Sequence, residues 1–156
     1  MAESVTQAET PTQTQGSCLC GAVKFSLSGP PSLKLLCHCL SCKKVSGSLF
    51  QANSIFTTNQ LTLSPSTSSE AIKTYIDTSP DSKSSVHRSF CMECGSRLWN
   101  TKPDQYPDML VVMVGVLDLS DKEWVDWKPE TEFFCKRRGG WLGDDGARGD
   151  ARRGEM

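Results

Sequence analysis

The stretch Cys37-His38-Cys39-Leu40-Ser41-Cys42 carries three thiols in six residues, and a cysteine pair lies on either side of it in the chain. These pairs are Cys18-Leu19-Cys20 and Cys91-Met92-Glu93-Cys94. A CxC or CxxC pair commonly directs two sulfurs toward one metal ion. Seven clustered thiols do not fill two four-coordinate sites, so one site would be closed and the other would keep a vacant position. A closed zinc site is normally structural, whereas a three-ligand site can bind water or substrate. The count predicts two zinc ions, one for folding and one for chemistry.

Disulfide bonds are the alternative use of these cysteines. Eight Cys in 156 residues is a smaller share than disulfide scaffolds have. The N-terminus, MAESVTQAETPTQTQGS, shows neither the basic start nor the apolar run of a signal peptide. No stretch approaches the roughly 18 apolar residues of a membrane helix. We therefore expect an intracellular, cytoplasmic protein with reduced thiols, and in such proteins clustered Cys more often bind metal.

The net charge of the chain indicates which kinds of partner it is suited to bind. The net charge is −1 and the pI is near 6.1, whereas nucleic-acid binding needs a basic surface. We expect no nucleic-acid and no membrane partner, and the sequence gives no indication of oligomeric state.

Composition divides the chain into one domain and two tails. Residues 1–15 are rich in Thr, Gln, Ser and Glu, which predicts a disordered tail. Apart from its alanines and the last Met, the segment 143–156, GDDGARGDARRGEM, has no aliphatic residue, and we expect it to be a flexible tail. The segment between them, 16–142, is the predicted zinc-binding domain, a size typical of a single domain.

Strand patterns dominate this domain. Apolar and polar residues alternate from Val23 to Leu27, as in a half-buried strand. The longest apolar run, Met109 to Leu117, is rich in β-branched residues, which favours a buried strand over a helix. The predicted fold class is mainly β, a single zinc-stapled domain with few short helices. The predicted strands are 23–27, 32–36, 49–56, 60–63, 70–76, 86–90 and 109–117, and the predicted helices are 41–45 and 120–124.

A glycine directly follows the second Cys of both outer pairs, at Gly21 and Gly95. Glycine there lets the backbone turn so that its N–H groups approach the thiolate sulfurs. The spacing leaves the pairing of the thiols open. One solution joins the two outer pairs in a tetrathiolate that cross-links distant parts of the chain, and leaves the central stretch as a compact open site.

Three segments, SCLCGAVKF, LLCHCLSCKKVSGSLF and HRSFCMECGSRLW, resemble in order and spacing the glutathione-dependent formaldehyde-activating enzyme family, whose domain is shared with centromere protein V. The resemblance covers about residues 16–142. It implies a β-rich fold similar to that of the small zinc-containing Rab exchange factor. It also implies that the structural zinc is held by Cys18, Cys20, Cys91 and Cys94. The second zinc, at the site of thiol chemistry, would be held by Cys37, Cys39 and Cys42.

An open three-thiolate zinc site suits a soft sulfur ligand, because three anionic sulfurs weaken the Lewis acidity of the metal. Glutathione is therefore a sensible co-substrate. We expect a zinc-dependent carbon–sulfur lyase-type enzyme that acts on glutathione adducts or a related small electrophile. Its partner would be a thiol-containing small molecule. The alternatives are a non-catalytic zinc-stabilised interaction module and a family member recruited to a specialised small-molecule pathway.

Residues beside the clusters supply candidate acids and anion anchors. His38 lies between two ligands, and we expect it to act in catalysis through a hydrogen bond or a substrate contact rather than as a ligand. Lys43 and Arg88 are candidate contacts for the carboxylates of glutathione, although each also fits a surface charge. Cys135 stands outside every cluster and is expected to be a buried free thiol. Further candidates are Lys44 and His87.

Overall fold

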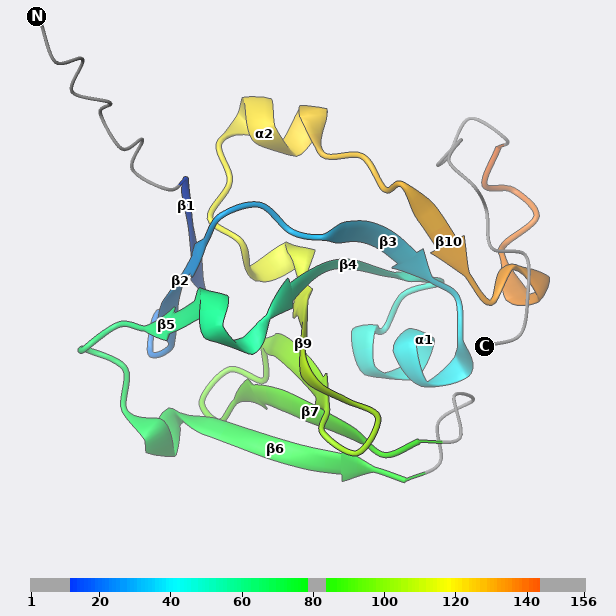
Figure 1. The fold of residues 1–156 in the computed structure, drawn as a ribbon. Coiled ribbons are helices and arrows are strands. Elements are labelled where there is room, and N and C mark those ends of the chain that lie inside the picture. The colour runs from blue at the N-terminus through cyan, green and yellow to red at the C-terminus, as the bar shows by residue number, and fades with distance from the viewer. Residues whose placement is uncertain (1–11, 79–83, 144–156) are drawn as a thin grey trace, which may run out of the picture.

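The computed structural model describes residues 12–78 and 84–143, and this part of the chain is mainly β with few short helices, as predicted (Figure 1). The strands are β1 (Gln13–Ser17), β2 (Lys24–Ser28), β3 (Leu33–Cys37), β4 (Gln51–Thr57), β5 (Leu61–Leu63), β6 (Ile72–Asp77), β7 (Val86–Cys91), β8 (Arg97–Lys102), β9 (Tyr106–Met113) and β10 (Thr131–Phe133). The α-helices are α1 (Leu40–Ser46) and α2 (Asp121–Asp126). Single 3-10 turns are η1 (Thr58–Gln60), η2 (Ser69–Ala71), η3 (Val114–Val116) and η4 (Cys135–Arg137).

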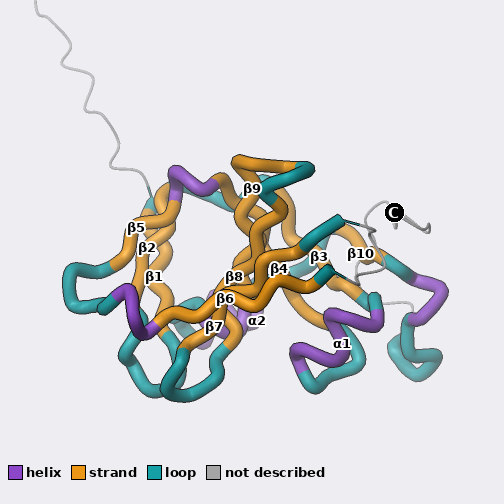
Figure 2. Tube along the Cα trace, turned by 90° about the horizontal axis from the view of Figure 1, so that it is seen from below, coloured by secondary structure: helices purple, strands orange, loops and turns teal. Residues whose placement is uncertain are grey.

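The strands form two sheets. The small sheet has the order β1-β2-β5, and the large sheet has the order β10-β3-β4-β9-β8-β7-β6. Figure 2 shows the small sheet and the β10–β3 edge at opposite ends of the molecule. The pairs that link β3 through β9 to β6 are antiparallel, whereas β10 pairs parallel with β3. A late segment of the chain is thereby placed beside an early strand.

One face of the large sheet packs against the small sheet and forms the main core. Leu110 and Val112 of β9 point into it and are almost fully buried. The ring of Phe25 on β2 meets that of Trp99 on β8 edge to face, with centroids 5.5 Å apart. Because side chains alternate along a strand, the residues between these face the other side of the sheet. That second face carries the site described below.

Local signals explain both α-helices. The sulfur of Cys39 accepts the N–H of Cys42 at the start of α1, and Gly47 ends the helix with a φ of 63°. Ser120 and Glu123 form a capping box at the start of α2. No helix in residues 12–78 and 84–143 combines the length and the apolar character needed to cross a bilayer.

Some predicted boundaries were wrong. β1 begins at Gln13, inside the segment predicted to be a tail, because its backbone pairs with β2 and needs no apolar side chains for this. The apolar run from Met109 stays extended only to Met113 and then forms η3. β8 and β10 were not predicted. Residues 1–11 and 144–156, which make up most of the two predicted tails, lie outside the described residues.

Candidate functional site

The two outer cysteine pairs meet in space. Their four sulfurs lie within 4.8 Å of one another, although 71 positions separate Cys20 from Cys91 in the chain. Gly21 and Gly95 have φ values of 76° and 71°, which a glycine adopts without strain. The N–H of Val23 donates to the sulfur of Cys18 at 3.2 Å. Four converging thiols with N–H donors around them fit a closed zinc site. We call this set the closed cluster: Cys18, Cys20, Cys91 and Cys94.

Ser96 ties the two halves of the closed cluster together. Its hydroxyl accepts the N–H of Leu19 at 3.0 Å and contacts the sulfur of Cys94 at 3.2 Å. The hydrogen bond from Ser96 lowers the pKa of the Cys94 thiol to about 5. A thiol that ionises this readily is prepared for metal binding, because the thiolate is the ligand form.

Cys37, Cys39 and Cys42 form a second group, the open cluster. Their sulfurs also lie within 4.8 Å of one another, and all three residues are buried. Cys37 ends β3, and the sulfur of Cys39 accepts the N–H of Cys42 at 3.3 Å. These local contacts bring the three sulfurs together within six residues of the chain.

The electrostatics of the open cluster favour a bound cation. Hydrogen bonds from the Cys37 and Cys42 side chains lower the pKa of Cys39 to about 2, while the bond to Cys39 raises the pKa of Cys37 to about 12. Contacts with both neighbours raise the pKa of Cys42 as well. One thiolate can thus form alone, but three packed negative charges repel each other. A divalent metal ion would remove that repulsion, so the cluster could hold zinc with three thiolates.

A cavity of about 260 Å³ adjoins the open cluster. Its floor is one face of the large sheet, where Arg88 lies opposite Asn100, Asn100 opposite Val111, and Val111 opposite Ile55. Because these residues share a register row across neighbouring strands, their side chains project together. This floor is mostly apolar but includes a few polar side chains. The apolar residues that line it are Leu35, Ile55, Val86, Met109 and Val111.

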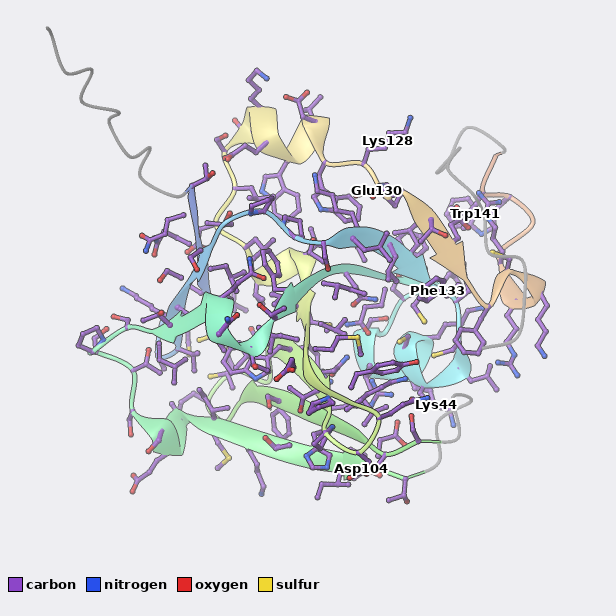
Figure 3. All side chains as sticks on the ribbon, in the orientation of Figure 1. Lys44, Asp104, Lys128, Glu130, Phe133 and Trp141 are labelled. Carbon is purple, nitrogen blue, oxygen red and sulfur yellow. The ribbon has the colours of Figure 1, made fainter. Side chains whose placement is uncertain are left out.

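The opposite wall comes from the C-terminal part of the domain. Phe133 pairs with Cys37 in the parallel β10–β3 register, and Figure 3 shows it at the end of β10. Phe134 follows with a φ of 58°, a left-handed conformation that is uncommon for a residue with a side chain. Both rings line the cavity, and Phe134 is buried. Tyr106, half exposed in the β8–β9 hairpin, lines it as well.

Three polar side chains in the cavity differ in what they already bind. Arg88 is buried and donates from Nε and Nη2 to Oδ2 of Asp77 at 2.9 and 2.7 Å. The side chain of Lys102 has no hydrogen bond or ion pair to another residue that the structure describes, and burial lowers its pKa. Asn53 is buried and donates to the carbonyl of Gln51 at 3.3 Å, while its Oδ1 accepts no hydrogen bond from the described residues. Of these three side chains, Lys102 therefore offers an unpaired amine to the cavity and Asn53 offers an unpaired amide oxygen.

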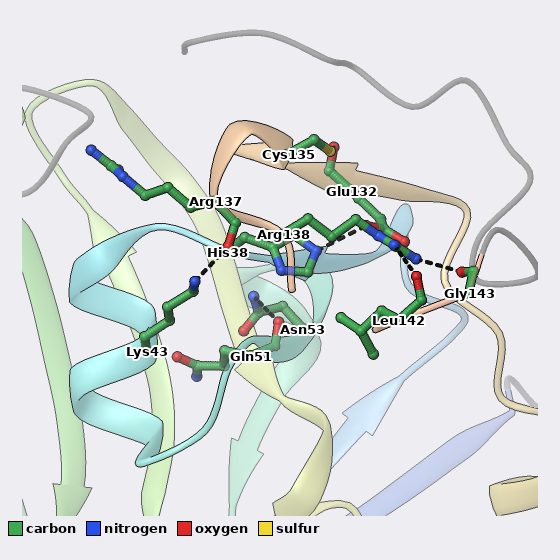
Figure 4. A network of polar contacts seen from close by, with 10 residues as sticks. All are labelled: His38, Lys43, Gln51, Asn53, Glu132, Cys135, Arg137, Arg138, Leu142 and Gly143. Atoms are coloured by element: carbon green, nitrogen blue, oxygen red, sulfur yellow. Dashed lines mark hydrogen bonds and ion pairs between the residues drawn. The ribbon is translucent and has the colours of Figure 1, made fainter. Parts of the chain in front are cut away.

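Only some of the site residues predicted from the sequence line the cavity. His38 is fully buried, and its Nε2 contacts Oε2 of Glu132 at 2.8 Å. The same carboxylate accepts Nε of Arg138 at 2.7 Å (Figure 4). His38 is not among the residues that line the cavity. It joins the loop that carries the cysteines to β10.

Of the two predicted anion anchors, Arg88 lines the cavity and Lys43 does not. The Lys43 ammonium donates to the carbonyl of Arg137 at 2.5 Å (Figure 4). The interpretation of Arg88 as a surface charge is wrong, because 2% of the residue is exposed and it is paired with Asp77.

The remaining candidates lie away from the open cluster. Lys44 is exposed on α1 (Figure 3), His87 is half-buried, and neither lines the cavity. Cys135 is half-buried rather than buried, and its thiol donates to the carbonyl of Glu132 at 3.4 Å. It belongs to neither cluster.

Sequence reasoning missed Lys102 and Asn53. Lys102 lies on β8, and without that strand its face could not be assigned. Asn53 lies inside a predicted strand between Ala52 and Ser54 and two residues before Ile55, and its polar side chain on the Ile55 face was the signal that could have found it.

A sequence model of the family described as glutathione-dependent formaldehyde-activating enzyme matches residues 13–137. No curated protein matches the chain. The crystal structure of a protein from Rhodobacter sphaeroides is similar to it, with a TM-score of 0.51 and 18% sequence identity, over 70% of this chain and 94% of that one. At that identity, the likeness supports the fold alone.

Proposed function

This chain belongs to the glutathione-dependent formaldehyde-activating enzyme family, and from that premise we propose that it makes or breaks a carbon–sulfur bond between a thiol and a carbonyl electrophile. Glutathione is the first candidate for the thiol. The observation that carries the proposal is the cavity of about 260 Å³ against three converging sulfurs. A non-catalytic interaction module needs no cavity beside a three-sulfur site.

Two zinc ions fit this arrangement, one in each cluster. A zinc ion held by Cys37, Cys39 and Cys42 would bind the substrate sulfur as a thiolate, which is the chemistry that a soft site with a vacant position supplies. The apolar walls around the cluster would exclude water from the sulfur and from the carbonyl carbon. This exclusion strengthens the electrostatic interactions among the polar groups that remain.

Lys102 and Asn53 are the residues that we assign to the oxygen of the electrophile. When the thiolate sulfur attacks the carbonyl carbon, the C–S bond forms, the C=O π pair moves to oxygen, and oxygen takes a proton from the Lys102 ammonium. In the lyase direction, the hydroxyl proton passes to the Lys102 amine, the C=O bond forms again, and the sulfur leaves with the C–S pair. Oδ1 of Asn53 would accept the hydroxyl of the adduct and hold it in place. General acid–base catalysis of this kind typically contributes about 10²–10⁴ in rate.

Arg88 and His38 have supporting parts in this proposal. Asp77 fixes the guanidinium of Arg88 in the cavity wall, where its remaining N–H groups could meet an oxygen of the substrate. The Glu132 carboxylate binds His38. We therefore assign to His38 the positioning of Cys37 and Cys39, which flank it in the chain, rather than proton transfer.

A cobalt-substituted sample tests the proposal, because the thiolate charge-transfer band reports on the metal environment. Glutathione should change this band in the wild type and leave it unchanged in Cys39→Ser. NMR exchange spectroscopy should show that the zinc-loaded wild type accelerates exchange between glutathione and its aldehyde adducts. Cys135→Ser is the matched control, since it removes a thiol outside both clusters. An unchanged band together with an unaccelerated exchange would favour the interaction module.

A further inference from the structure

The size and the lining of the cavity indicate which kind of electrophile would fit it. We infer that the carbonyl compound has a bulky apolar body, as in an aromatic or branched aliphatic aldehyde, and that this body fills the cavity while the peptide part of the thiol stays at its mouth. The inference rests on the proposed function and names the substrate class for the same site.

The cavity is much larger than a one-carbon electrophile. A single water needs about 10–15 Å³ of cavity space, and formaldehyde has only two heavy atoms. The cavity measures about 260 Å³. A one-carbon electrophile would leave most of this space to water against apolar walls, whereas an aromatic or branched body would displace that water. Displacing water from apolar surface favours binding.

Apolar and aromatic side chains make up much of the cavity walls. Ile55, Met109 and Val111 project from the sheet, and the rings of Phe133 and Phe134 face the cavity from the segment at β10. Phe134 adopts a φ of 58°, a conformation with a free-energy cost for a residue with a side chain. The fold thus holds an aromatic ring in this wall against a local backbone preference. Apolar and aromatic walls with few polar groups are typical of sites for apolar ligands.

The charges of glutathione do not match those of the cavity. Glutathione carries two carboxylates and one ammonium, and burying them without partners is costly. None of the described residues that line the cavity is an Asp or a Glu, so the ammonium has no carboxylate to meet there. Asp77 already balances the charge of Arg88, so among the described residues that line the cavity Lys102 is the cation without a carboxylate partner, and it can meet one anionic or carbonyl oxygen. The tripeptide therefore does not fill the cavity, and the group that comes from the carbonyl compound occupies it instead.

Asn53 and Lys102 provide polar groups in the cavity for the oxygen of an adduct. An adduct of a thiol with any aldehyde has a hydroxyl on the carbon that carries the sulfur. Oδ1 of Asn53 accepts no hydrogen bond from the described residues, and the side chain of Lys102 has no hydrogen bond or ion pair with them. The bond changes are the same for every aldehyde, and only the group on the carbon differs.

Stable thioethers test the inference without turnover. S-benzylglutathione and S-methylglutathione share the peptide and differ in the group that would enter the cavity. Titration calorimetry on the zinc-loaded full chain should show that the benzyl compound binds roughly 10- to 100-fold more tightly, because one aromatic group becomes buried. Val111→Phe, which fills the cavity, should abolish this preference, and Met109→Phe is a second filling variant. Ile76→Phe is the matched control, because Ile76 is exposed on the edge strand β6.

Activity separates this inference from the proposed function. If the wild type accelerates formaldehyde exchange with glutathione but binds both thioethers equally, the inference fails and the proposed function stands. A benzyl preference that survives in both filling variants would place the ligand elsewhere and overturn the inference. If neither thioether binds and no aldehyde exchange is accelerated, both proposals fall. The wild-type comparison decides the matter even if both filling variants fail to fold.

Discussion

Cys91→Ser should remove most or all of the stability of the domain. Cys91 is fully buried, and its sulfur lies 3.8 Å from that of Cys20, which is 71 residues away in the chain. In the chain-entropy model, a cross-link that closes a loop of this length contributes about 4 kcal/mol. A serine hydroxyl left in the buried position costs a further ~1–3 kcal/mol. A domain of this size is stable by about 5–15 kcal/mol, so the summed loss is comparable with the whole free energy of unfolding.

Urea unfolding followed by circular dichroism, with zinc content measured on the same samples, checks this prediction. The variant should be insoluble or unfolded, or should unfold at much lower urea than the wild type. Cys135→Ser is the control for replacing a thiol as such and should change the free energy of unfolding little. The reasoning would be refuted if Cys91→Ser unfolded within about 1 kcal/mol of the wild type and retained full zinc content.

Three further variants test separate parts of the site. Cys39→Ser should stay folded, hold a single zinc in the closed cluster and lose thiol–aldehyde exchange, and global unfolding would show instead that the open cluster is structural. Asp77→Asn leaves the buried charge of Arg88 without its partner, so the free energy of unfolding should fall by about 3–5 kcal/mol, and the double variant with Arg88→Met should recover part of it. Burial lowers the pKa of Lys102 below 10.5, so exchange that needs its ammonium should decline with rising pH before 10.5, whereas Lys102→Met should be about 100-fold slower and lack that decline.

The sequence predicted the clusters well because the ligand turns are local. A CxC or CxxC pair followed by glycine determines where two sulfurs point without reference to the rest of the fold. The grouping of the outer pairs needed the resemblance to the family, since spacing alone left it open. Most strands were also predictable, because their alternation depends on neighbouring residues.

Orientation was harder to predict than position. Lys43 follows Cys42 directly, but successive residues on an α-helix point about 100° apart, so its ammonium reaches Arg137 and not the cavity. His38 lies between two clustered cysteines, and its side chain points to Glu132. Adjacency in a motif is therefore poor evidence for a place in the cavity.

The cavity itself could not be read from the sequence, because distant strands build it. Lys102 and Asn53 line one cavity although β9 lies between their strands, β8 and β4, and no local pattern encodes this arrangement. The pairing of β10 with β3 joins residues almost a hundred positions apart, as Phe133 lies opposite Cys37. Long-range pairing of this kind depends on the whole fold.

The parallel pairing of β10 with β3 has a consequence for the order of assembly during translation. The ribosome makes Cys42 long before Phe133, and at about 5–20 residues per second the interval of 91 residues lasts roughly 5–18 s. During this interval the open cluster has neither its aromatic wall nor the contact between Glu132 and His38. A metal ion could enter the nascent chain from solution in that time, and the arrival of β10 would then enclose it. Metal supply during synthesis, rather than affinity in the finished protein, would then determine which ion the site retains.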